Sequence, residues 1–406
     1  MKKRQFPIVS VTPKAERALR GGHPWVYDAE ITAVTGDIQN GCLADVASRK
    51  GAYLGTGLVS LESKIRLRIL SDNANETFSP AFWERRLRYA VDYRRAVMGD
   101  DFGCCRLVFG EADELPGLTV DRFSDILVTQ VLSYGIEMRK DMIYSLLIKI
   151  LGEYGVDISG IYERNDAALR EREGLELGKG WYEKYPHGET THTVICENGI
   201  DFDVDFENGQ KTGYFLDQKY NRLAVRRIAK GRRVLDCFTH TGSFALNAAK
   251  GGALKVTAAD VSETAIAQAR ANAVRNGLEE SIDFVCADVF ELLTETEKNG
   301  GRPYDFIILD PPAFTKSRKT VASAQRGYKE INYRAMKILP RGGYLATCSC
   351  SHFMRSDLFE DMLSQAAADA GVRLKQIEVR QQCCDHPILR NVPETDYLKF
   401  YIFQVI

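Results

Sequence analysis

The sequence predicts an α/β protein whose C-terminal part is a Rossmann-like, doubly wound parallel sheet with helices on both faces. Apolar strands alternate with helical segments over residues 196–406, which is typical of repeated strand–helix units. Aspartates lie at the ends of four of these strands, where doubly wound sheets bind their ligands. A chain of 406 residues is too long for one ordinary core, so we expect two smaller domains before this sheet.

The first 73 residues predict a small β-rich domain, either a barrel or a sandwich. Short strands are expected at 43–48, 53–60 and 65–70, with glycines between and within them. In the third of these strands, apolar residues alternate with arginines, which is typical of a strand with one buried face. The polar stretch SDNANET (71–77) is expected to be a linker.

A small α+β domain is predicted over residues 77–195. Its first helix should begin at Pro80 with Ser79 as N-cap, because proline suits the first turn and serine caps it. The apolar face of this helix consists of Trp83, Leu87, Ala90 and Val91. Strands are expected at 125–133 and 160–165, with a helix over 138–155.

The third predicted domain, 196–406, contains the strand–helix units. We expect its strands at 232–238, 255–260, 283–288, 304–310 and 342–349. The first two are followed by helices at 243–252 and 262–277, the second with Ser262 as its cap.

Composition predicts a cytoplasmic protein without a membrane span. No apolar run approaches the roughly 20 residues that a membrane helix needs, and the N-terminal segment has no apolar signal core. The ten cysteines are irregularly spaced, so we expect reduced thiols rather than a disulfide framework.

Positive charge is clustered although the net charge is only −1. Residues 1–20 contain Lys2, Lys3, Arg4, Lys14, Arg17 and Arg20, and residues 84–95 contain five arginines. Such clusters suit a phosphate backbone. A solvated helix face explains 84–95 equally well, so charge leaves nucleic-acid binding open.

The acidic strand ends predict a cofactor that contains adenosine. Asp236 and Asp260 are 24 residues apart, close to the spacing of about 20 at which an acid binds ribose hydroxyls. The loop between them, DCFTHTGSF (236–244), has one glycine, Gly242, and the bulky Phe238. A pyrophosphate needs more glycines than this, so S-adenosylmethionine (SAM) is favoured over NAD.

Two further segments belong to the predicted site. NGQKTGYFLDQKYNR (208–222) is rich in polar and aromatic residues and suggests a flap over the cofactor, although a plain β-hairpin explains it as well. ILDPPAF (308–314) predicts a rigid loop at a strand end, because each proline fixes its φ. That loop could present Asp310 to a flipped-out base, with Phe314 available for stacking.

The stretch CSCSHF (348–353) places two thiols at the end of the last predicted parallel strand. Methylation of pyrimidine C5 needs a thiolate that adds to C6, whereas methylation of an exocyclic amine needs no enzyme nucleophile. A cysteine at a strand end is more often a buried apolar residue. Together with the DPP loop and a SAM sheet, however, Cys350 becomes the predicted nucleophile. The spacings of a zinc site are absent, so no metal is expected.

These motifs together resemble the bacterial large-subunit (23S) rRNA cytosine-C5 methyltransferases with an N-terminal PUA domain. The resemblance spans nearly the whole chain. The segments that carry it are RGGHPWVYDAEI (20–31), RLVFGEADELPGLTVDRF (106–123), GQKTGYFLDQ (209–218), DCFTHTGSF, LDPPAF and SCS (349–351).

The resemblance implies a SAM-dependent class I methyltransferase that forms 5-methylcytidine in large-subunit rRNA and releases S-adenosyl-L-homocysteine. It implies Cys350 as nucleophile and Asp310 at the base, with Pro311 and Phe314 beside that base. Where many RNA cytosine-C5 enzymes have a second cysteine, this chain has Pro312 and Ala313. The predicted cofactor-binding residues are Lys211, Tyr214, Gln218, Asp236, Phe238, Thr239, Gly242, Asp260 and Asp288.

Three alternatives stay open on the sequence. A guanine methyltransferase with the same sheet would need no cysteine nucleophile, and a non-catalytic ribosome-assembly factor would use only the PUA domain to bind RNA. An NAD-dependent oxidoreductase is the third. The choice of Cys350 over Cys348 depends on the strand register, and the central domain could position RNA or pair two copies in a homodimer.

Overall fold

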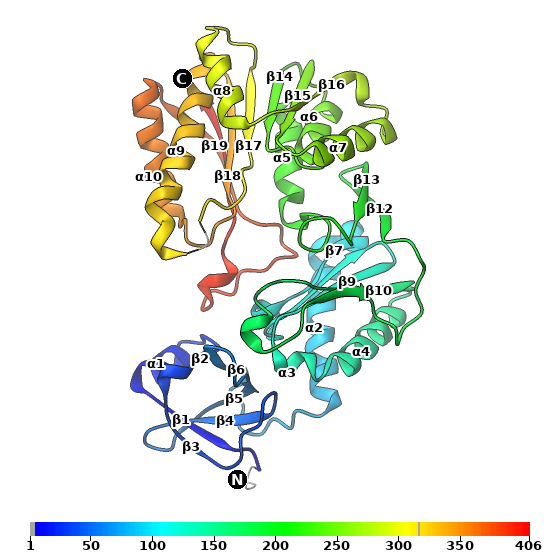
Figure 1. Ribbon diagram of the computed structural model, residues 1–406, viewed down its shortest axis with the longest axis vertical. Helices are drawn as coiled ribbons and strands as arrows, with labels where there is room; N and C mark the ends of the chain where they lie inside the picture. Colours follow the sequence, from blue (N-terminus) through cyan, green and yellow to red (C-terminus); the bar gives the residue numbers. More distant parts are fainter. Residues whose placement is uncertain (1–4, 316) are drawn as a thin grey trace. The chain divides into compact units, whose positions relative to one another are not determined.

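The computed structural model describes residues 5–315 and 317–406, which form two compact units (Figure 1). The first unit contains the chain up to Ile195 together with Val204–Leu216 and Cys384–Thr395. The second contains Cys196–Asp203, Asp217–Cys383 and Asp396–Ile406. Within these described ranges, none of the helices combines the length and the apolarity that crossing a bilayer requires.

A six-stranded sheet in the order β2-β6-β5-β4-β1-β3 forms the N-terminal part of the first unit. Val9, Val11, Val26, Val46 and Leu67 fill its core with side chains that are fully buried. The predicted strands at 43–48, 53–60 and 65–70 are confirmed. The elements are β1 (Ile8–Val11), α1 (Pro13–Arg20), β2 (Trp25–Tyr27), β3 (Ile31–Thr35), β4 (Leu43–Ser48), β5 (Tyr53–Val59) and β6 (Ile65–Ser71).

A second sheet, in the order β11-β10-β9-β8-β7, follows in the same unit. Helix α2 begins at Pro80 as predicted, and Trp83, Leu87, Ala90 and Val91 are buried. Ser79 occupies the N-cap position, but its side chain makes no capping hydrogen bond, which corrects its predicted role. The elements are α2 (Pro80–Met98), β7 (Cys104–Phe109), β8 (Leu118–Phe123), β9 (Ile126–Val131), α3 (Tyr134–Glu137), α4 (Lys140–Glu153), β10 (Gly160–Asn165) and β11 (Gly178–Trp181).

Buried charges inside the first unit are paired. Arg68 and Glu173 are 6% and 3% exposed, and Arg68 Nη2 donates to Glu173 Oε1 at 2.6 Å. Arg68 Nη1 and Ser60 Oγ donate to the other oxygen, Oε2, at 3.1 and 2.7 Å. The carboxylate and guanidinium therefore satisfy each other away from water.

The second unit contains a seven-stranded sheet in the order β16-β15-β14-β17-β18-β20-β19. All strands run parallel except β20, which pairs antiparallel with both of its neighbours. All five predicted strands are confirmed, whereas β19 and β20 were not predicted. The strands are β14 (Arg233–Cys237), β15 (Lys255–Asp260), β16 (Ile282–Cys286), β17 (Phe306–Leu309), β18 (Tyr344–Ser349), β19 (Leu374–Arg380) and β20 (Lys399–Val405). A separate two-stranded sheet pairs β12 (His192–Glu197) with β13 (Ile200–Asp205).

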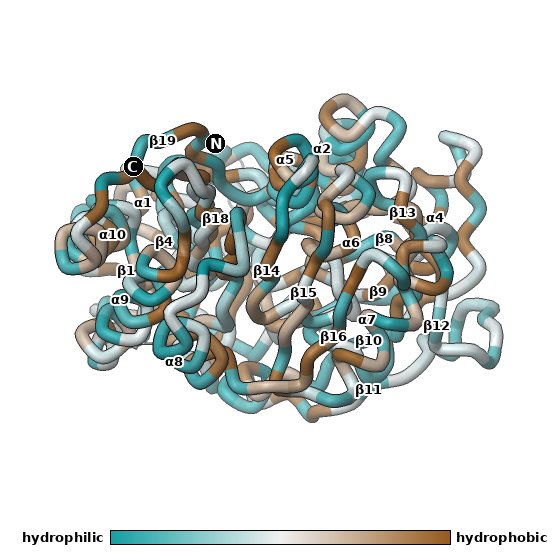
Figure 2. The backbone as a smooth tube through the Cα atoms, turned by 90° about the horizontal axis from the view of Figure 1, so that it is seen from above, coloured by the Kyte–Doolittle hydropathy of each residue, from teal (hydrophilic) through white to brown (hydrophobic). Residues whose placement is uncertain are grey.

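Helices cover both faces of the seven-stranded sheet, as Figure 1 shows. The group α8, α9 and α10 packs through an apolar core that includes Leu293, Tyr328 and Phe359, and the apolar stretches of β14 and β15 are brown in Figure 2. Strand order reverses beside β14, so the crevice at its carboxyl end is the expected ligand site. The helices are α5 (Lys219–Ile228), α6 (Ser243–Lys250), α7 (Glu263–Arg275), α8 (Val289–Lys298), α9 (Val321–Ile338) and α10 (Ser356–Ala370).

Candidate functional site

Asp236 lies near the end of β14 with a fully buried carboxylate. Its Oδ2 accepts hydrogen bonds from Thr239 Oγ1 at 2.5 Å and from the amide of Ala245 at 2.9 Å. Its Oδ1 is buried and has no hydrogen-bond partner among the described residues. Burial raises the pKa of Asp236 to about 7, and the charges of Asp310 and Asp260 also raise it. An unpartnered buried acceptor of this kind suits a positively charged ligand group.

The loop after β14 has an unusual backbone. Phe238 and His240 have φ values of 64° and 50°, which are uncommon for residues with side chains. Gly242 has φ 80° at the start of α6, and a Cβ there would come within 2.8 Å of Leu246 Cδ1. Such strain persists only where the surrounding structure enforces it, and it is frequent at ligand sites.

Asp260 ends β15 and fixes this loop. Its Oδ2 accepts from the amide of His240 at 2.9 Å and its Oδ1 from the amide of Ser262 at 3.0 Å. Each carboxylate oxygen has further lone pairs, so a ligand hydroxyl can still be bound. Asp288 lies two residues beyond β16, not at its end as predicted, and caps α8 by accepting from the amides of Phe290 and Glu291 at 2.8 and 3.1 Å.

Asp310 follows β17, is partly buried, and forms a cluster with the buried Gln218 and Cys348. Gln218 Nε2 and Cys348 Sγ donate to Asp310 Oδ1 at 3.1 and 3.0 Å. Asn221 Nδ2 donates to Gln218 Oε1 at 2.6 Å and so orients the amide. Burial raises the pKa of Asp310. The carboxyl group is thus held by two neutral donors.

The two thiols of CSCSHF differ in environment. Cys348 is fully buried in β18, and burial, followed by Asp310, raises its pKa well above the usual range. A thiol kept protonated is a poor nucleophile. Cys350 lies one residue beyond β18 and is partly exposed. Its flanking serines are anchored, Ser349 Oγ to Tyr328 Oη at 3.0 Å and Ser351 Oγ to the carbonyl of Thr315 at 2.8 Å.

The DPP loop places Pro311 in the interior and Phe314 at a partly exposed position. The Phe314 ring lies 4.6 Å from that of Tyr328, centroid to centroid, and 6.1 Å from that of Phe290. The sequence predicted that the Phe314 ring is available to stack on a base. In the structure, the Tyr328 ring already packs against the Phe314 ring.

The predicted flap is divided between the two units. Lys211 and Tyr214 belong to the first unit, where Tyr214 is buried and Lys211 Nζ lies 4.9 Å from the centroid of the Phe215 ring. Gln218 belongs to the second unit, with the other predicted site residues. No strand is present in 206–215, so the plain β-hairpin alternative is wrong.

Residues near the C-terminus also reach the site, and none of them was predicted to do so. Tyr397 Oη donates to Asp217 Oδ2 at 2.6 Å, beside the residue that orients Asp310. Lys399 Nζ donates to the carbonyl of Ser351 at 2.6 Å. A charged residue at the start of the apolar strand KFYIFQV was the available signal, but its partner is 48 residues away.

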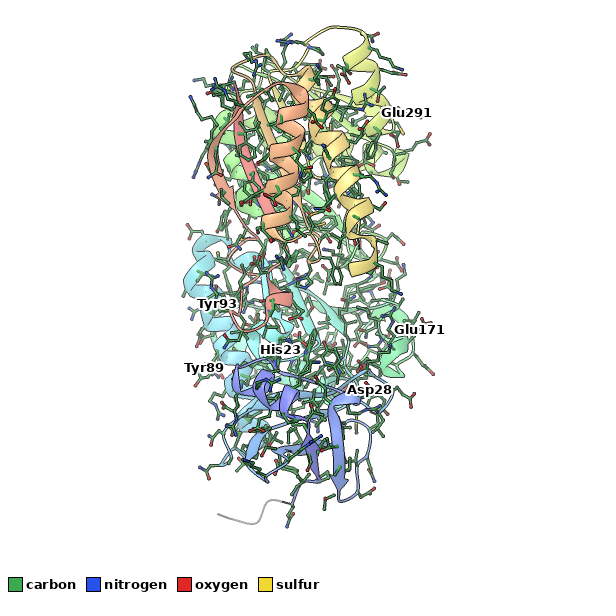
Figure 3. All side chains as sticks on the ribbon, turned by 90° about the vertical axis from the view of Figure 1, so that its left-hand side faces the viewer. His23, Asp28, Tyr89, Tyr93, Glu171 and Glu291 are labelled. Atoms are coloured by element: carbon green, nitrogen blue, oxygen red, sulfur yellow. The ribbon has the colours of Figure 1, made fainter. Side chains whose placement is uncertain are left out.

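The arginine cluster 84–95 is largely engaged in ion pairs. Arg85 pairs with Glu76 at 2.6 Å, Arg88 with Glu153 at 2.8 Å, and the fully buried Arg94 with Asp113. This favours the solvated-helix interpretation over a free phosphate-binding surface. Figure 3 shows the exposed Tyr89 and Tyr93 on the same helix, α2. Lys2, Lys3 and Arg4 of the other predicted cluster lie outside the described residues.

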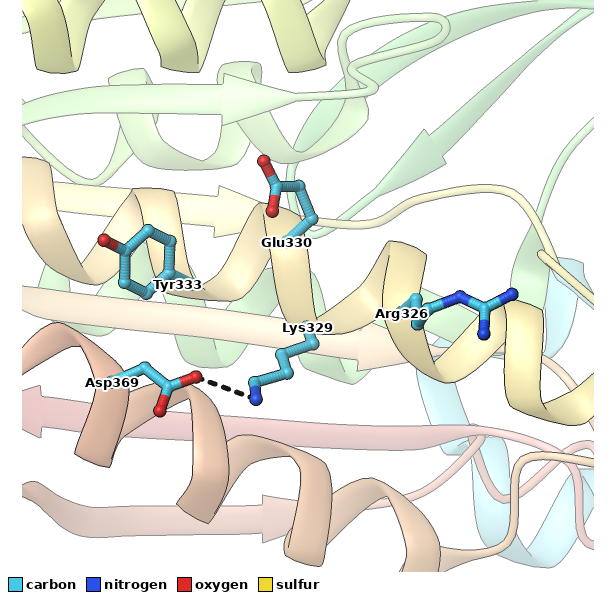
Figure 4. Close-up of a pocket in the computed structure, with 5 residues that line it drawn as sticks. All are labelled: Arg326, Lys329, Glu330, Tyr333 and Asp369. Atoms are coloured by element: carbon cyan, nitrogen blue, oxygen red, sulfur yellow. Dashed lines mark ion pairs between the residues drawn. The ribbon is translucent and has the colours of Figure 1, made fainter.

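A hollow of about 580 Å³ lies on α9 and α10, and its walls include none of the predicted site residues. Figure 4 shows the five side chains that line it, Arg326, Lys329, Glu330, Tyr333 and Asp369. Lys329 Nζ and Asp369 Oδ2 form an ion pair at 2.8 Å across it. This ion pair therefore partly neutralises the charged side chains that line the hollow.

Comparison with known proteins defines the class. Residues 179–400 match the family model of S-adenosylmethionine-dependent methyltransferases, and residues 9–72 match that of PUA-like domains. A solved structure described as a SAM-dependent methyltransferase from Streptococcus mutans has a TM-score of 0.81 at 21% identity, covering 98% of this chain and 99% of that one. A methyltransferase complexed with SAH has a TM-score of 0.82, with the same identity and coverage. The fold and these matches define a SAM-dependent methyltransferase with a PUA-like domain.

Named relatives identify the family within this class of methyltransferases. The protein named ribosomal RNA large subunit methyltransferase I of Klebsiella pneumoniae strain 342 is 39% identical over 405 residues, 99% of each chain. Its namesake in Escherichia coli O157:H7 is 39% identical over 395 residues, covering 96% of this chain and 97% of the relative. The chain belongs to the ribosomal RNA large subunit methyltransferase I family.

Proposed function

We propose that this protein methylates C5 of a cytosine in large-subunit rRNA through a covalent bond between Cys350 Sγ and C6. The observation that carries the proposal is the contrast between the thiols. Cys348 is buried and donates to Asp310 at 3.0 Å, whereas Cys350 is partly exposed just beyond the strand. Of the two thiols, Cys350 is the one that a substrate base could reach.

The residues present suit SAM at the end of β14. The buried Oδ1 of Asp236, which lacks a partner among the described side chains and backbone groups, can accept from the ammonium group of the methionine moiety. Asp260 can accept from ribose hydroxyls with its remaining lone pairs. We propose Phe238, Thr239 and Gly242 as the loop around the cofactor, with Gln218 and Asp288 as its further contacts.

The chemistry follows from the two reactive groups. Cys350 adds to C6 as a thiolate, and Asp310, whose pKa is raised by burial, donates a proton to N3 so that electron density collects at C5. Bound SAM supplies the methyl group to C5. Removal of the C5 proton by a general base then breaks the C6–S bond, Cys350 leaves as a thiolate, and the N3 proton returns to Asp310.

The test uses methyl-labelled SAM and rRNA from a strain that lacks this gene, digested to nucleosides after the reaction. We expect label in 5-methylcytidine with the wild type and with Cys348→Ala, and none with Cys350→Ala. Label in a methylguanosine that persists in Cys350→Ala would replace the proposal with the guanine alternative. No label with any variant would favour an RNA-binding assembly factor.

A further inference from the structure

Lys399 is a buried lysine that the proposed chemistry does not use. Its residue is 4% exposed at the start of β20. Strand pairing places it opposite Ser349 of β18, the residue before Cys350. Lysine is rarely buried without a partner that justifies the loss of hydration.

The ammonium group is tied to the backbone of the nucleophile loop. Nζ donates to the carbonyl of Ser351 at 2.6 Å and to the carbonyl of Tyr397 at 2.9 Å. Ser351 directly follows Cys350 and is itself anchored to the carbonyl of Thr315. A change at Lys399 would therefore act on the segment that carries the thiol.

Because Lys399 lies opposite Ser349 and donates to the carbonyl of Ser351, its charge lies beside the segment that carries Cys350. Burial lowers the pKa of Lys399 to about 8, while the charge of a Cys350 thiolate, and after it Asp396, acts to raise it. The interaction is reciprocal, because an ammonium that is favoured by a neighbouring thiolate favours that thiolate equally. Cationic neighbours of this kind are what lower the pKa of reactive cysteines.

We propose that Lys399 is a positioning residue that holds the loop of Cys350 through the Ser351 carbonyl and stabilises the Cys350 thiolate with its ammonium charge. Its use in catalysis rests on the proposed function, but its effect on the thiol does not. A purely structural lysine would hold the loop equally well and leave the ionisation of Cys350 unchanged. The two possibilities therefore differ in the pH dependence of the thiol.

The experiment measures alkylation of the full-length protein by iodoacetamide between pH 6 and 10, with each cysteine followed by peptide mass spectrometry. Lys399→Met removes the charge and keeps the length, and Lys399→Arg keeps the charge. Lys375→Met, at an exposed position on β19, is the matched control. The exposed Cys286 reports general reactivity, and the fully buried Cys237 reports loss of the fold.

We expect Lys399→Met to slow alkylation of Cys350 at pH 7.5 about tenfold and to raise the pH midpoint of this alkylation by about one unit. The two figures agree because a shift of about one pH unit changes the thiolate fraction about tenfold. Lys399→Arg should recover most of the rate, and Lys375→Met and Cys286 should be unchanged. A wild-type midpoint in Lys399→Met, with Cys237 still protected, would overturn the proposal. If Cys237 becomes reactive in Lys399→Met, that variant has lost its fold, and Lys399→Arg is used for the test instead. A Cys350 midpoint that is also raised in Lys399→Arg would overturn the proposal.

This readout needs neither RNA nor methyl transfer, so the two proposals can fail separately. An altered Cys350 midpoint together with label in methylguanosine would retain the role of Lys399 and reject the cytosine chemistry. An unaltered midpoint together with label in 5-methylcytidine would do the reverse.

Discussion

Buried carboxylates of the first unit and the carboxyl groups of the candidate site, in the second unit, have different partners, although the second unit also pairs the buried Glu197 with Arg222 at 2.9 Å. In the first unit, Glu173 meets Arg68 at 2.6 Å and Asp121 meets Arg106 at 2.7 Å, so each carboxylate has a guanidinium. In the second unit, Asp236 and Asp310 accept hydrogen bonds from hydroxyl, thiol, amide and backbone donors, all neutral. Burial raises the pKa of both.

We infer that the first kind of carboxylate stabilises the fold, whereas the second kind is suited to bind a ligand. A paired carboxylate is satisfied in the folded protein and has nothing to gain from a third group. A buried carboxyl with a raised pKa and an unpartnered oxygen destabilises the empty protein and gains from a bound cation. Four substitutions, taken from the largest expected effect to the smallest, test whether this distinction holds.

Glu173→Ala should destabilise the first unit most. It leaves Arg68 buried without its carboxylate, and breaking a buried pair costs about 3–5 kcal/mol in the free energy of unfolding. Chemical denaturation followed by circular dichroism measures the change. Lys184→Ala is the control, because Lys184 and Asp141 form an exposed pair and such pairs contribute about 0–1 kcal/mol. Equal losses in both variants would show that the burial of the Arg68 pair is irrelevant to stability.

Asp260→Ala should weaken SAM binding by roughly 10- to 100-fold. The substitution removes the proposed ribose acceptor and the tether of the His240 amide, and a hydrogen bond to a charged group contributes about 1.5–3 kcal/mol. Isothermal titration calorimetry gives the affinity. Asp283→Ala, exposed on the adjacent β16, should bind SAM like the wild type. Unaltered affinity in Asp260→Ala would mean that the ribose lies elsewhere.

Asp236→Asn should change stability and affinity in opposite directions. The folded-state pKa of Asp236, about 7, lies above its ordinary value. The contribution of Asp236 to the free energy of unfolding is therefore fully present below pH ~4, and it is lost as the pH rises through 7 and the buried carboxyl group ionises. The neutral variant should therefore be more stable than the wild type at pH 8, by about 1–3 kcal/mol, with no such gain at pH 4.

The same variant should bind SAM about tenfold more weakly, because it cannot offer a negative charge to the ammonium group. Wild-type affinity should itself fall as the pH drops below 7, where Asp236 becomes protonated. Urea unfolding without ligand and calorimetry with SAM measure the two effects. Tight, pH-independent binding by Asp236→Asn would remove this residue from the cofactor site.

Cys348→Ala should have the smallest effect, a loss of less than about tenfold in turnover. Asp310 keeps its hydrogen bond from Gln218 when the thiol is removed, so only part of its orientation is lost. Methyl transfer under saturating SAM measures the rate. A loss as large as that of Cys350→Ala would show that the two thiols cannot be distinguished by burial and hydrogen bonding.

The sequence was most informative where structure is local. The central strands β14, β17 and β18 are mostly apolar and buried, as interior parallel strands are, and these three were predicted together with β15 and β16. Strand β19 was missed because the sequence LKQIEVR is mostly polar and exposed. Strand β20 was missed because it joins the sheet only after the segment Cys384–Thr395, which belongs to the other unit.

In the candidate site, too, the residues with a local sequence signal were predicted and those without one were missed. Asp236, Asp260 and Asp310 could be found because the carboxyl ends of neighbouring parallel strands meet at one edge of a sheet. Asp288 follows the same pattern but caps a helix, and one sequence does not separate the two roles. The hydrogen bond between Cys348 and Asp310 depends on the register of the parallel strands β17 and β18. The contact of Lys399 with Ser351 depends on the antiparallel pairing of β18 with β20. Neither has a local signal in the sequence.

The central claim is that Cys350 bonds covalently to the target base. The most direct measurement incubates the wild type, Cys348→Ala and Cys350→Ala with SAM and rRNA in which 5-fluorocytidine replaces cytidine. Because fluorine at C5 cannot leave as a proton does, a methylated adduct would be trapped and would survive denaturing gels. We predict an RNA-linked peptide containing Cys350 in the wild type and Cys348→Ala, and none in Cys350→Ala. An active wild type that forms no adduct, or an adduct that persists in Cys350→Ala, would contradict the account.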